Sequence, residues 1–462
     1  MPLAPGLPIP AALQTLAFAG HPYRFLRALG ERYGDTCAFD LLGEGTIVLF
    51  SAPEAVKEIF RLPPAELRSA NETVSYLLDP RSVIFLEGEE HHTHRRLMSP
   101  PFEGRALEGY APAILRALDA ATRDVRDGAE LALAPVLQRA TFDALLGAIL
   151  GLEPAPRWEP LREELLAFVN GQLTAPMFFA ALVAGSRLRG RLERGAAEAK
   201  ARLRRGEGAP RVAAFARRSA NLARVELLLE ELVAERRRAP TSGGDVLSRF
   251  AAHCGPTQVS DRDVVQELLT LLIAGHDTTS LALSWAIVRC LQRPEVIDRL
   301  RDELRPAVTP DGVDPAAVGQ CAYLDAVVTE SLRLDPVAAF APRRSTRDLT
   351  IGGTRLPAGT RFAANVIGAH HRVETWGDPL AFRPERFLGA GPSPTVFLPF
   401  GGGYRRCVGA AFARYEMGLV LARLFTGFSL ALPRGYRATP SVHGFLIGPR
   451  WPVRVRASRR AS

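Results

Sequence analysis

Cysteine is scarce in this sequence of 462 residues, and its cysteines are not paired. The chain has an odd number of them, far apart: Cys37, Cys254, Cys290, Cys321 and Cys407. Scattered, odd-numbered cysteines are not the pattern of a disulfide framework, and they favour a reducing compartment such as the cytoplasm. Because no second cysteine lies near Cys407, a C-x-x-C zinc or redox site is excluded at that position.

The sequence also lacks a targeting segment, a long linker and internal repeats. Its first ten residues contain no basic residue and no long apolar run, so they are neither a signal peptide nor a membrane anchor. No Pro/Gly-rich stretch divides the chain. We therefore expect one cytoplasmic domain over residues 1–462.

Lysine is nearly absent, since only Lys57 and Lys200 occur, and arginine carries almost all of the formal charge of +9. A basic surface suits an acidic protein, anionic lipid or nucleic acid, although a GC-rich genome equally produces arginine excess. Arginines are dense over 187–238, but few aromatic residues for base stacking lie among them. We interpret this segment as the outward faces of amphipathic helices and expect no nucleic-acid partner.

Helical periodicity dominates the chain. It predicts helices over 11–34, 55–60, 112–122, 131–151, 160–184, 221–235 and about 408–428, and strands over 45–50, 349–353, 360–365 and within 429–457. Ser260 and Asp263 form a helix-start pattern before a long apolar helix that ends near Arg293. His276 and Asp277 interrupt its apolar run, which excludes a transmembrane span. The sequence predicts a mainly α protein with a small β portion.

Cys407 lies in the decapeptide Phe400–Gly409, which is the most informative segment of the chain. Gly401–Gly403 allow the backbone to approach a flat ligand closely. The predicted helix that follows supplies free N–H groups and a positive dipole end, which stabilise an anionic sulfur. A lone thiolate held by a glycine loop is what a haem iron needs as a ligand. The alternative is a buried cysteine after a glycine turn.

This decapeptide resembles the haem-binding signature of the cytochrome P450 family, Phe-x-x-Gly-x-x-x-Cys-x-Gly. It is matched by Phe400, Gly403, Cys407 and Gly409, and the match continues at Ala413 and Glu416. The resemblance implies haem b as the cofactor and the family's fold, with one long central helix over the haem. It also implies the following roles: Cys407 binds the iron, Phe400 shields the sulfur, Gly401 and Gly409 contact the haem, and Arg405 pairs with a propionate.

Residues 274–279, Ala-Gly-His-Asp-Thr-Thr, lie in the middle of the long helix. Gly275 and the threonine hydroxyls weaken the helical hydrogen bonds, and such places often form bulges at functional sites. A buried Asp277 needs a partner or water, so it is either ion-paired to an arginine or delivers protons. The hexapeptide resembles the family's oxygen-activation motif. That resemblance implies that Thr278 holds dioxygen and water while Asp277 relays protons.

Two more motifs have the family's order. Glu330 and Arg333 resemble its Glu-x-x-Arg helix, and Pro384–Phe387 resembles its Pro-Glu-Arg-Phe meander. The resemblance implies that Arg386 joins Glu330 and Arg333 in a buried charge network on the haem-loop side. We expect these residues to be structural, because removing one would leave a buried charge unpaired.

Three of the four residues 91–94 are histidines, but no third type of ligand lies near them, so zinc is not favoured. The surrounding Gly-x-x-His-x-x-x-Arg pattern resembles the family's, which implies that His91 and Arg95 contact a haem propionate. Arg343 is the expected third contact, with Arg344 as a substitute.

The resemblance covers about residues 15–450, and it is nearest to soluble bacterial members of the group that acts on fatty acids and terpenes. It implies a haem-thiolate monooxygenase that inserts one atom of O2 into a lipophilic small molecule. No fused reductase is expected, so electrons come from a ferredoxin and ferredoxin reductase, or a flavodoxin. An acidic ferredoxin would dock behind Cys407. We expect a monomer without a membrane anchor. The alternatives are a peroxide-driven peroxygenase or isomerase and a non-catalytic haem sensor.

The resemblance also implies which segments line the substrate pocket. They are 67–87, 165–185, the helix around Ala274 and His276, Val337–Phe340 and Val442–Leu446. Apolar side chains dominate them, namely Phe340, Phe445, Leu446, Met177 and Phe178, which favours a lipophilic substrate.

Overall fold

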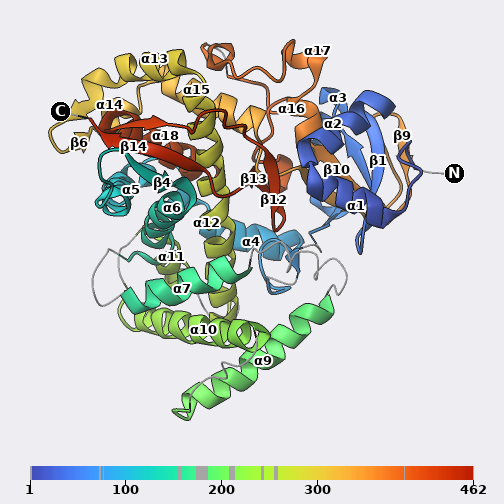
Figure 1. Cartoon of the computed structure of the whole chain (residues 1–462). Helices are drawn as coiled ribbons and strands as arrows, with labels where there is room; N and C mark the ends of the chain where they lie inside the picture. The colour runs from blue at the N-terminus through green and yellow to red at the C-terminus, as the bar shows by residue number, and fades with distance from the viewer. Residues whose placement is uncertain are drawn as a thin grey trace.

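The computed structural model describes residues 3–71, 74–75, 78–152, 159–172, 186–207, 214–240, 244–253, 259–389 and 391–460. Helices dominate them (Figure 1). The helices are α1 (Ala11–Gly20), α2 (Pro22–Tyr33), α3 (Pro53–Arg61), α4 (Gly88–Met98), α5 (Ala106–Thr122), α6 (Leu133–Leu150), α7 (Glu159–Gln172), α9 (Ser186–Arg204), α10 (Ala214–Arg238), α11 (Val246–His253), α12 (Asp261–Leu291), α13 (Pro294–Leu304), α14 (Pro315–Val318), α15 (Ala322–Leu334), α16 (Val366–His370), α17 (Val373–Trp376) and α18 (Ala410–Gly427).

The strands are short and form small sheets. They are β1 (Thr36–Leu41), β2 (Gly45–Phe50), β3 (Leu67–Ser69), β4 (Ala129–Ala132), β5 (Val308–Thr309), β6 (Gly312–Val313), β7 (Phe340–Ser345), β8 (Leu349–Ile351), β9 (Thr354–Leu356), β10 (Arg361–Asn365), β11 (Phe428–Ala431), β12 (Pro440–His443), β13 (Leu446–Pro449) and β14 (Arg454–Arg459). The largest sheet has the order β1-β2-β10-β7-β3, and only its β2–β10 pair is parallel. The prediction of a mainly α protein with a small β portion is confirmed.

Helix α12 crosses the middle of the molecule, and helices surround it (Figure 1). Its 31 residues span roughly 46 Å at the usual helical rise. The predicted start is confirmed, because Ser260 and Asp263 form a reciprocal capping box. Helices α6 and α12 are long and apolar enough to cross a membrane, but 72% and 83% of their most apolar windows are buried inside the fold. The core helix of a soluble protein can be equally long and apolar, so the length and composition of α6 and α12 are weak evidence for a membrane span.

The predicted helix over 11–34 is wrong in one respect, because it is two helices, α1 and α2. His21 separates them with an extended backbone, φ −149° and ψ 74°. Pro22 explains the break, since a proline disfavours helical backbone in the residue before it and cannot donate a helical hydrogen bond. Of the predicted helix over 160–184, residues 160–172 belong to α7, and 173–184 lie outside the described residues. The other predicted helices and strands are present, with shifted ends.

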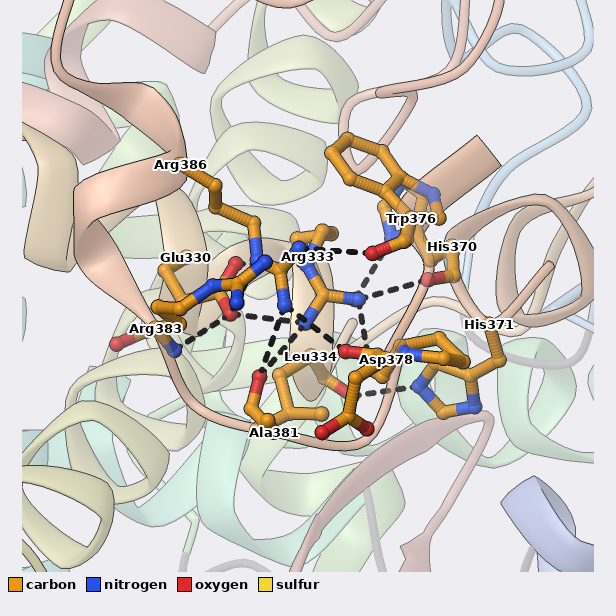
Figure 2. A network of polar contacts seen from close by, with 12 residues as sticks. Glu330, Arg333, Leu334, His370, His371, Trp376, Asp378, Ala381, Arg383 and Arg386 are labelled. Atoms are coloured by element: carbon orange, nitrogen blue, oxygen red, sulfur yellow. Dashed lines mark hydrogen bonds and ion pairs between the residues drawn. The ribbon is translucent and has the colours of Figure 1, made fainter. Parts of the chain in front are cut away.

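The predicted charge network is confirmed, and Figure 2 shows its members from close by. Glu330 and Arg333 on α15 are fully buried and form a two-pronged ion pair with distances of 2.6 and 2.9 Å. Arg386 contacts the Glu330 carboxylate at 3.1 Å, and the backbone N–H of Arg383 donates to it at 2.9 Å. Each member is therefore paired, as burial of charge requires.

Arg333 also organises the segment that leads to the Cys407 loop. Its guanidinium donates to the carbonyls of His370 and Pro379 at 2.8 and 2.9 Å. The His370 ring is 3.0 Å from the Arg333 carbonyl through Nδ1, and its Nε2 accepts from the Leu398 N–H at 2.9 Å. Leu398 immediately precedes Pro399 and Phe400 in the sequence. The network is thus connected to the start of the Cys407 loop through one imidazole.

We predict that Arg333→Met lowers the free energy of unfolding by about 3–5 kcal/mol, because the fully buried Glu330 carboxylate loses its two-pronged partner and keeps only the Arg386 contact. Urea unfolding followed by circular dichroism measures the change. Arg305→Met is the matched control, since Arg305 and Asp302 have the same i, i+3 spacing but side chains 79% and 70% exposed. An exposed pair contributes little. Equal effects of the two substitutions would contradict the prediction.

A second prediction concerns pH. Burial lowers the pKa of His371 from 6.5 to about 4. The unfolded chain therefore binds a proton that the folded protein rejects between these values, so stability is full above pH 6.5 and is lost as pH falls toward 4. His371→Gln, which can still donate to the Leu334 carbonyl that Nε2 contacts at 2.8 Å, should reduce this slope by about 1.4 kcal/mol per pH unit. Unfolding free energies at pH 5 and 7 test it. His253→Gln, at an exposed histidine, should leave the slope unchanged.

Candidate active site

A cavity of about 440 Å3 lies between α12, α4, β7 and the Cys407 loop. Its wall is largely apolar, and the apolar side chains that line it include Met98, Phe102, Leu145, Leu271, Val337, Phe340 and Leu446. Thr278 of α12 and Cys407 also line it. The Cys407 side chain is exposed to this interior space. The fold thus directs a single thiol into an apolar chamber.

Local hydrogen bonds shape the Cys407 loop. The N–H of Cys407 donates to the Phe400 carbonyl at 2.9 Å, which closes the loop. Burial raises the pKa of the Cys407 thiol, and the backbone N–H of Gly409 together with Arg95 and Arg406 opposes that rise. These groups are the means by which the loop can stabilise a thiolate.

One glycine of this loop lines the cavity, and the other two pack against α3. Gly401 lines the cavity and has φ +63°, which favours glycine. A Cβ on Gly402 would lie 2.3 Å from the Phe60 ring, and a Cβ on Gly403 would lie 2.6 Å from the Phe60 carbonyl. Gly402 and Gly403 therefore allow close packing of the loop against α3 rather than close approach to a ligand.

Two arginines and a histidine line one edge of the cavity. Arg95 and His91 line it from α4, and Arg343 lines it from β7. Burial and the nearby Arg405, Arg95 and Arg343 lower the pKa of His91 to about 4, and burial together with Arg405 lowers that of Arg343 to about 10. Among the described residues, the side chain of Arg95 has no hydrogen-bond or ion-pair partner. An arginine without an acidic partner is unusual inside a protein. Its presence at the cavity edge fits an anionic ligand with two carboxylates, as haem has.

Two other arginines, Arg405 and Arg344, were also predicted as contacts of a haem propionate. Arg405 lines the cavity, but its guanidinium donates to the carbonyls of Val83 and Ile84 at 3.0 Å and pairs with Glu87 at 2.9 Å. Arg344, the predicted substitute for Arg343, does not line the cavity, because neighbouring strand residues point to opposite faces.

The histidines of α4 also diverge. His91 faces the cavity, whereas the His94 imidazole lies 2.6 Å from the Glu267 carboxylate. Within the part of the chain that the structure describes, no three histidine, cysteine or acidic side chains are close enough to hold a metal ion.

The hexapeptide of α12 presents its threonine and its aspartate in different directions. Thr278 lines the cavity, and its hydroxyl donates to the Ala274 carbonyl at 2.8 Å. Asp277 is buried but does not line the cavity, and it accepts a hydrogen bond from Gln138 at 2.8 Å. The expected bulge is absent, since α12 continues as regular α-helix through these residues. Gly275 instead permits close packing with α6.

The predicted pocket segments agree in part. Residues 69, 71, 83 and 84, Ala274, Val337, Phe340 and Leu446 line the cavity, but His276 and Phe445 do not. His276 is fully buried, with Nε2 3.1 Å from the Asn170 side-chain oxygen. Met177 and Phe178 lie outside the described residues. Sequence reasoning missed Gln138 and Glu87, for which no local motif gives a signal.

Comparisons with known proteins agree with this arrangement. A family model described as Cytochrome P450 matches residues 1–204 and 211–451. Cytochrome P450 135B1 of Mycobacterium tuberculosis is 32% identical over 474 residues, which cover 100% of this chain and 93% of that protein. Cytochrome P450 138 of the same species is 30% identical over 460 residues, covering 99% and 97%.

Solved structures share the fold. Cyanobacterial CYP120A1, solved with retinoic acid bound, superposes with a TM-score of 0.80 at 24% identity, and both chains are covered completely. The haem domain of cytochrome P450DA superposes with a TM-score of 0.78 at 20% identity, covering 99% of this chain and 98% of that one. Together with the family match over most of its length, this shows that the chain belongs to the cytochrome P450 family of haem-thiolate monooxygenases.

Proposed function

We propose that the Cys407 thiolate is the iron ligand of a haem b and that the enzyme inserts one oxygen atom of O2 into a lipophilic small molecule. The observation that carries this proposal is a single thiol that faces an apolar cavity, with Arg95 and Arg343 along one edge, neither of which forms an ion pair with an acid of the described residues. Arg95, His91 and Arg343 hold the two haem carboxylates. Phe400 and Gly409, which flank Cys407 on the cavity wall, shield its sulfur.

When bound, the haem supplies the redox chemistry that splits dioxygen. The reaction consumes two electrons and two protons, so that one oxygen atom enters a C–H or C=C bond and the other leaves as water. Thr278 orients dioxygen and water in the cavity through its hydroxyl, and Asp277 delivers protons from the next position on α12. Its apolar wall excludes bulk water from the reacting atoms.

The substrate is apolar, in keeping with the wall of the cavity. Leu271, Val337, Phe340 and Leu446 offer hydrocarbon contacts and no charge. The retinoic acid bound to CYP120A1 is an isoprenoid acid, which supports a fatty acid or terpenoid substrate for this chain. A binding screen of such compounds, read by the spin state of the haem, identifies the substrate.

Electrons come from a separate acidic ferredoxin, with its reductase, or from a flavodoxin. A groove of about 800 Å3 lies on the other side of the Cys407 loop, and residues 401–403 contribute to both it and the loop. Lys57, Arg61, Arg406 and Arg414 line this groove. The basic groove, defined by these four residues, places positive charge next to the iron ligand, where an acidic donor protein would dock.

We predict that Cys407→Ala abolishes the carbon-monoxide band of a thiolate-ligated iron in the reduced protein, together with turnover. Absorption spectroscopy of the purified variant measures this. Cys290→Ala, at a buried cysteine of α12 that does not line the cavity, is the control and should keep the band. Retention of the thiolate band in Cys407→Ala would disprove the assigned ligand.

We also predict that Lys57→Glu with Arg61→Glu raises the KM for an acidic ferredoxin by about tenfold or more, because opposite charges steer docking. Both side chains are exposed on α3. Arg238→Glu on α10, which lies far from α3 in Figure 1, should change little. Turnover with added peroxide should be unaffected in both of these surface variants. Turnover with peroxide alone, and none with ferredoxin, would support the peroxygenase alternative instead.

A further inference from the structure

Helix α6 contacts the hexapeptide of α12 through one face. Phe142 and Leu145, three residues apart, meet His276 and Gly275 respectively. The rings of Phe142 and His276 lie edge to face with centroids 5.2 Å apart. A Cβ on Gly275 would lie 2.8 Å from a Leu145 methyl carbon, so the two helices approach as closely as glycine allows. The position of α6 is therefore fixed relative to this turn of α12.

Gln138 lies one turn before Phe142 on the same face. Its side-chain N–H group donates to Asp277 Oδ1 at 2.8 Å. Asp277 is 5% exposed, and a carboxylate this buried requires a donor. No arginine or lysine of the described residues lies within ion-pair distance of Asp277. The sequence left open an ion pair between Asp277 and an arginine. The structure shows the neutral amide of Gln138 in its place.

His276 does not take over this role. Its Nε2 lies 3.1 Å from Asn170 Oδ1, which can only accept, and 3.5 Å from Asp277 Oδ1. The ring therefore donates to Asn170 on α7, and burial lowers the pKa of His276, so it remains neutral. Gln138 is accordingly the hydrogen-bond donor that orients the carboxylate within the described part of the chain.

We propose that Gln138 is a positioning residue for the oxygen reaction. Its amide holds the Asp277 carboxylate outside the cavity, beside the turn that carries Thr278, and fixes where the acid delivers its proton. This inference rests on the proposed role of Asp277. Because Gln138 is neutral, the carboxylate can leave it without separating an ion pair, which lets the acid alternate between a stored and a delivering position.

Gln138→Leu removes the donor while keeping a similar volume. With substrate and electron donor present, we expect the share of electrons recovered as hydrogen peroxide to rise severalfold, and the solvent deuterium isotope effect on product formation to increase. The Kd of substrate should stay unchanged. Gln138→Asn, which keeps the amide but cannot reach, should act in the same direction. Arg139→Leu is the control, because Arg139 is exposed on the other side of α6.

Asp277→Asn separates the two proposals. If Asp277→Asn leaves the peroxide share at its wild-type value, the proposed role of Asp277 is wrong. If it raises the peroxide share and Gln138→Leu does not, the positioning role is wrong while the proposed function stands. The positioning role is also wrong if Gln138→Leu loses thermal stability while the share of electrons recovered as hydrogen peroxide stays at its wild-type value.

A measurement on the resting protein adds independent evidence. The unfolding free energies of Gln138→Leu, Asp277→Ala and the double variant form a double-mutant cycle. Since both substitutions remove the same hydrogen bond, their effects should be non-additive. Additive effects would mean that the two side chains do not interact, which would overturn the proposal.

Discussion

The ion pair between Glu330 and Arg333 is the interaction on which the site depends most. Both side chains are completely buried, so each charge needs a buried partner, and their two-pronged contact is reinforced by Arg386 at 3.1 Å from Glu330. Arg333 then fixes the carbonyls of the chain around His370 and Pro379, and His370 holds Leu398 at the entrance to the Cys407 loop. The position of the thiol is thus set by a charge pair that never touches the cavity.

Arg95 and Arg343 at the edge of the cavity, unlike Arg333, form no ion pair with an acid of the described residues. Elsewhere in the interior, buried cations meet acids, as Arg289 meets Asp335 at 2.6 Å and Arg236 meets Asp245 at 2.9 Å. Along the cavity edge, Arg95 and Arg343 have no such acid among the described residues, and burial together with both of them lowers the pKa of His91 to about 4. An arginine inside a protein without an acidic partner is costly, so the protein alone is incomplete at this edge. A ligand with two carboxylates supplies the balance, and the family membership identifies it as haem.

The sequence predicted what depends on neighbouring residues. The capping box at Ser260, the i, i+3 pair at Glu330 and the helix after Cys407 are local patterns, and each is present. The break at His21 could also have been predicted, because Pro22 follows it directly. What could not be predicted depends on segments far apart in the chain. Gly402 and Gly403 pack on Phe60, Arg405 is held by carbonyls of 83–84, and Gln138 reaches Asp277 across 139 residues.

The contact between Gln138 and Asp277 differs from the buried ion pairs, because the partner of the carboxylate is a neutral amide. A carboxylate that must move a proton has to be buried enough to avoid bulk water, yet free enough to change partner. Breaking a buried ion pair costs about 3–5 kcal/mol, whereas a hydrogen bond to a charged group contributes about 1.5–3 kcal/mol. The paired acids, such as Glu330, are therefore immobile parts of the structure. Asp277, held by one neutral amide next to a cavity-lining threonine, therefore has the smaller barrier to movement that its proposed role in proton delivery requires.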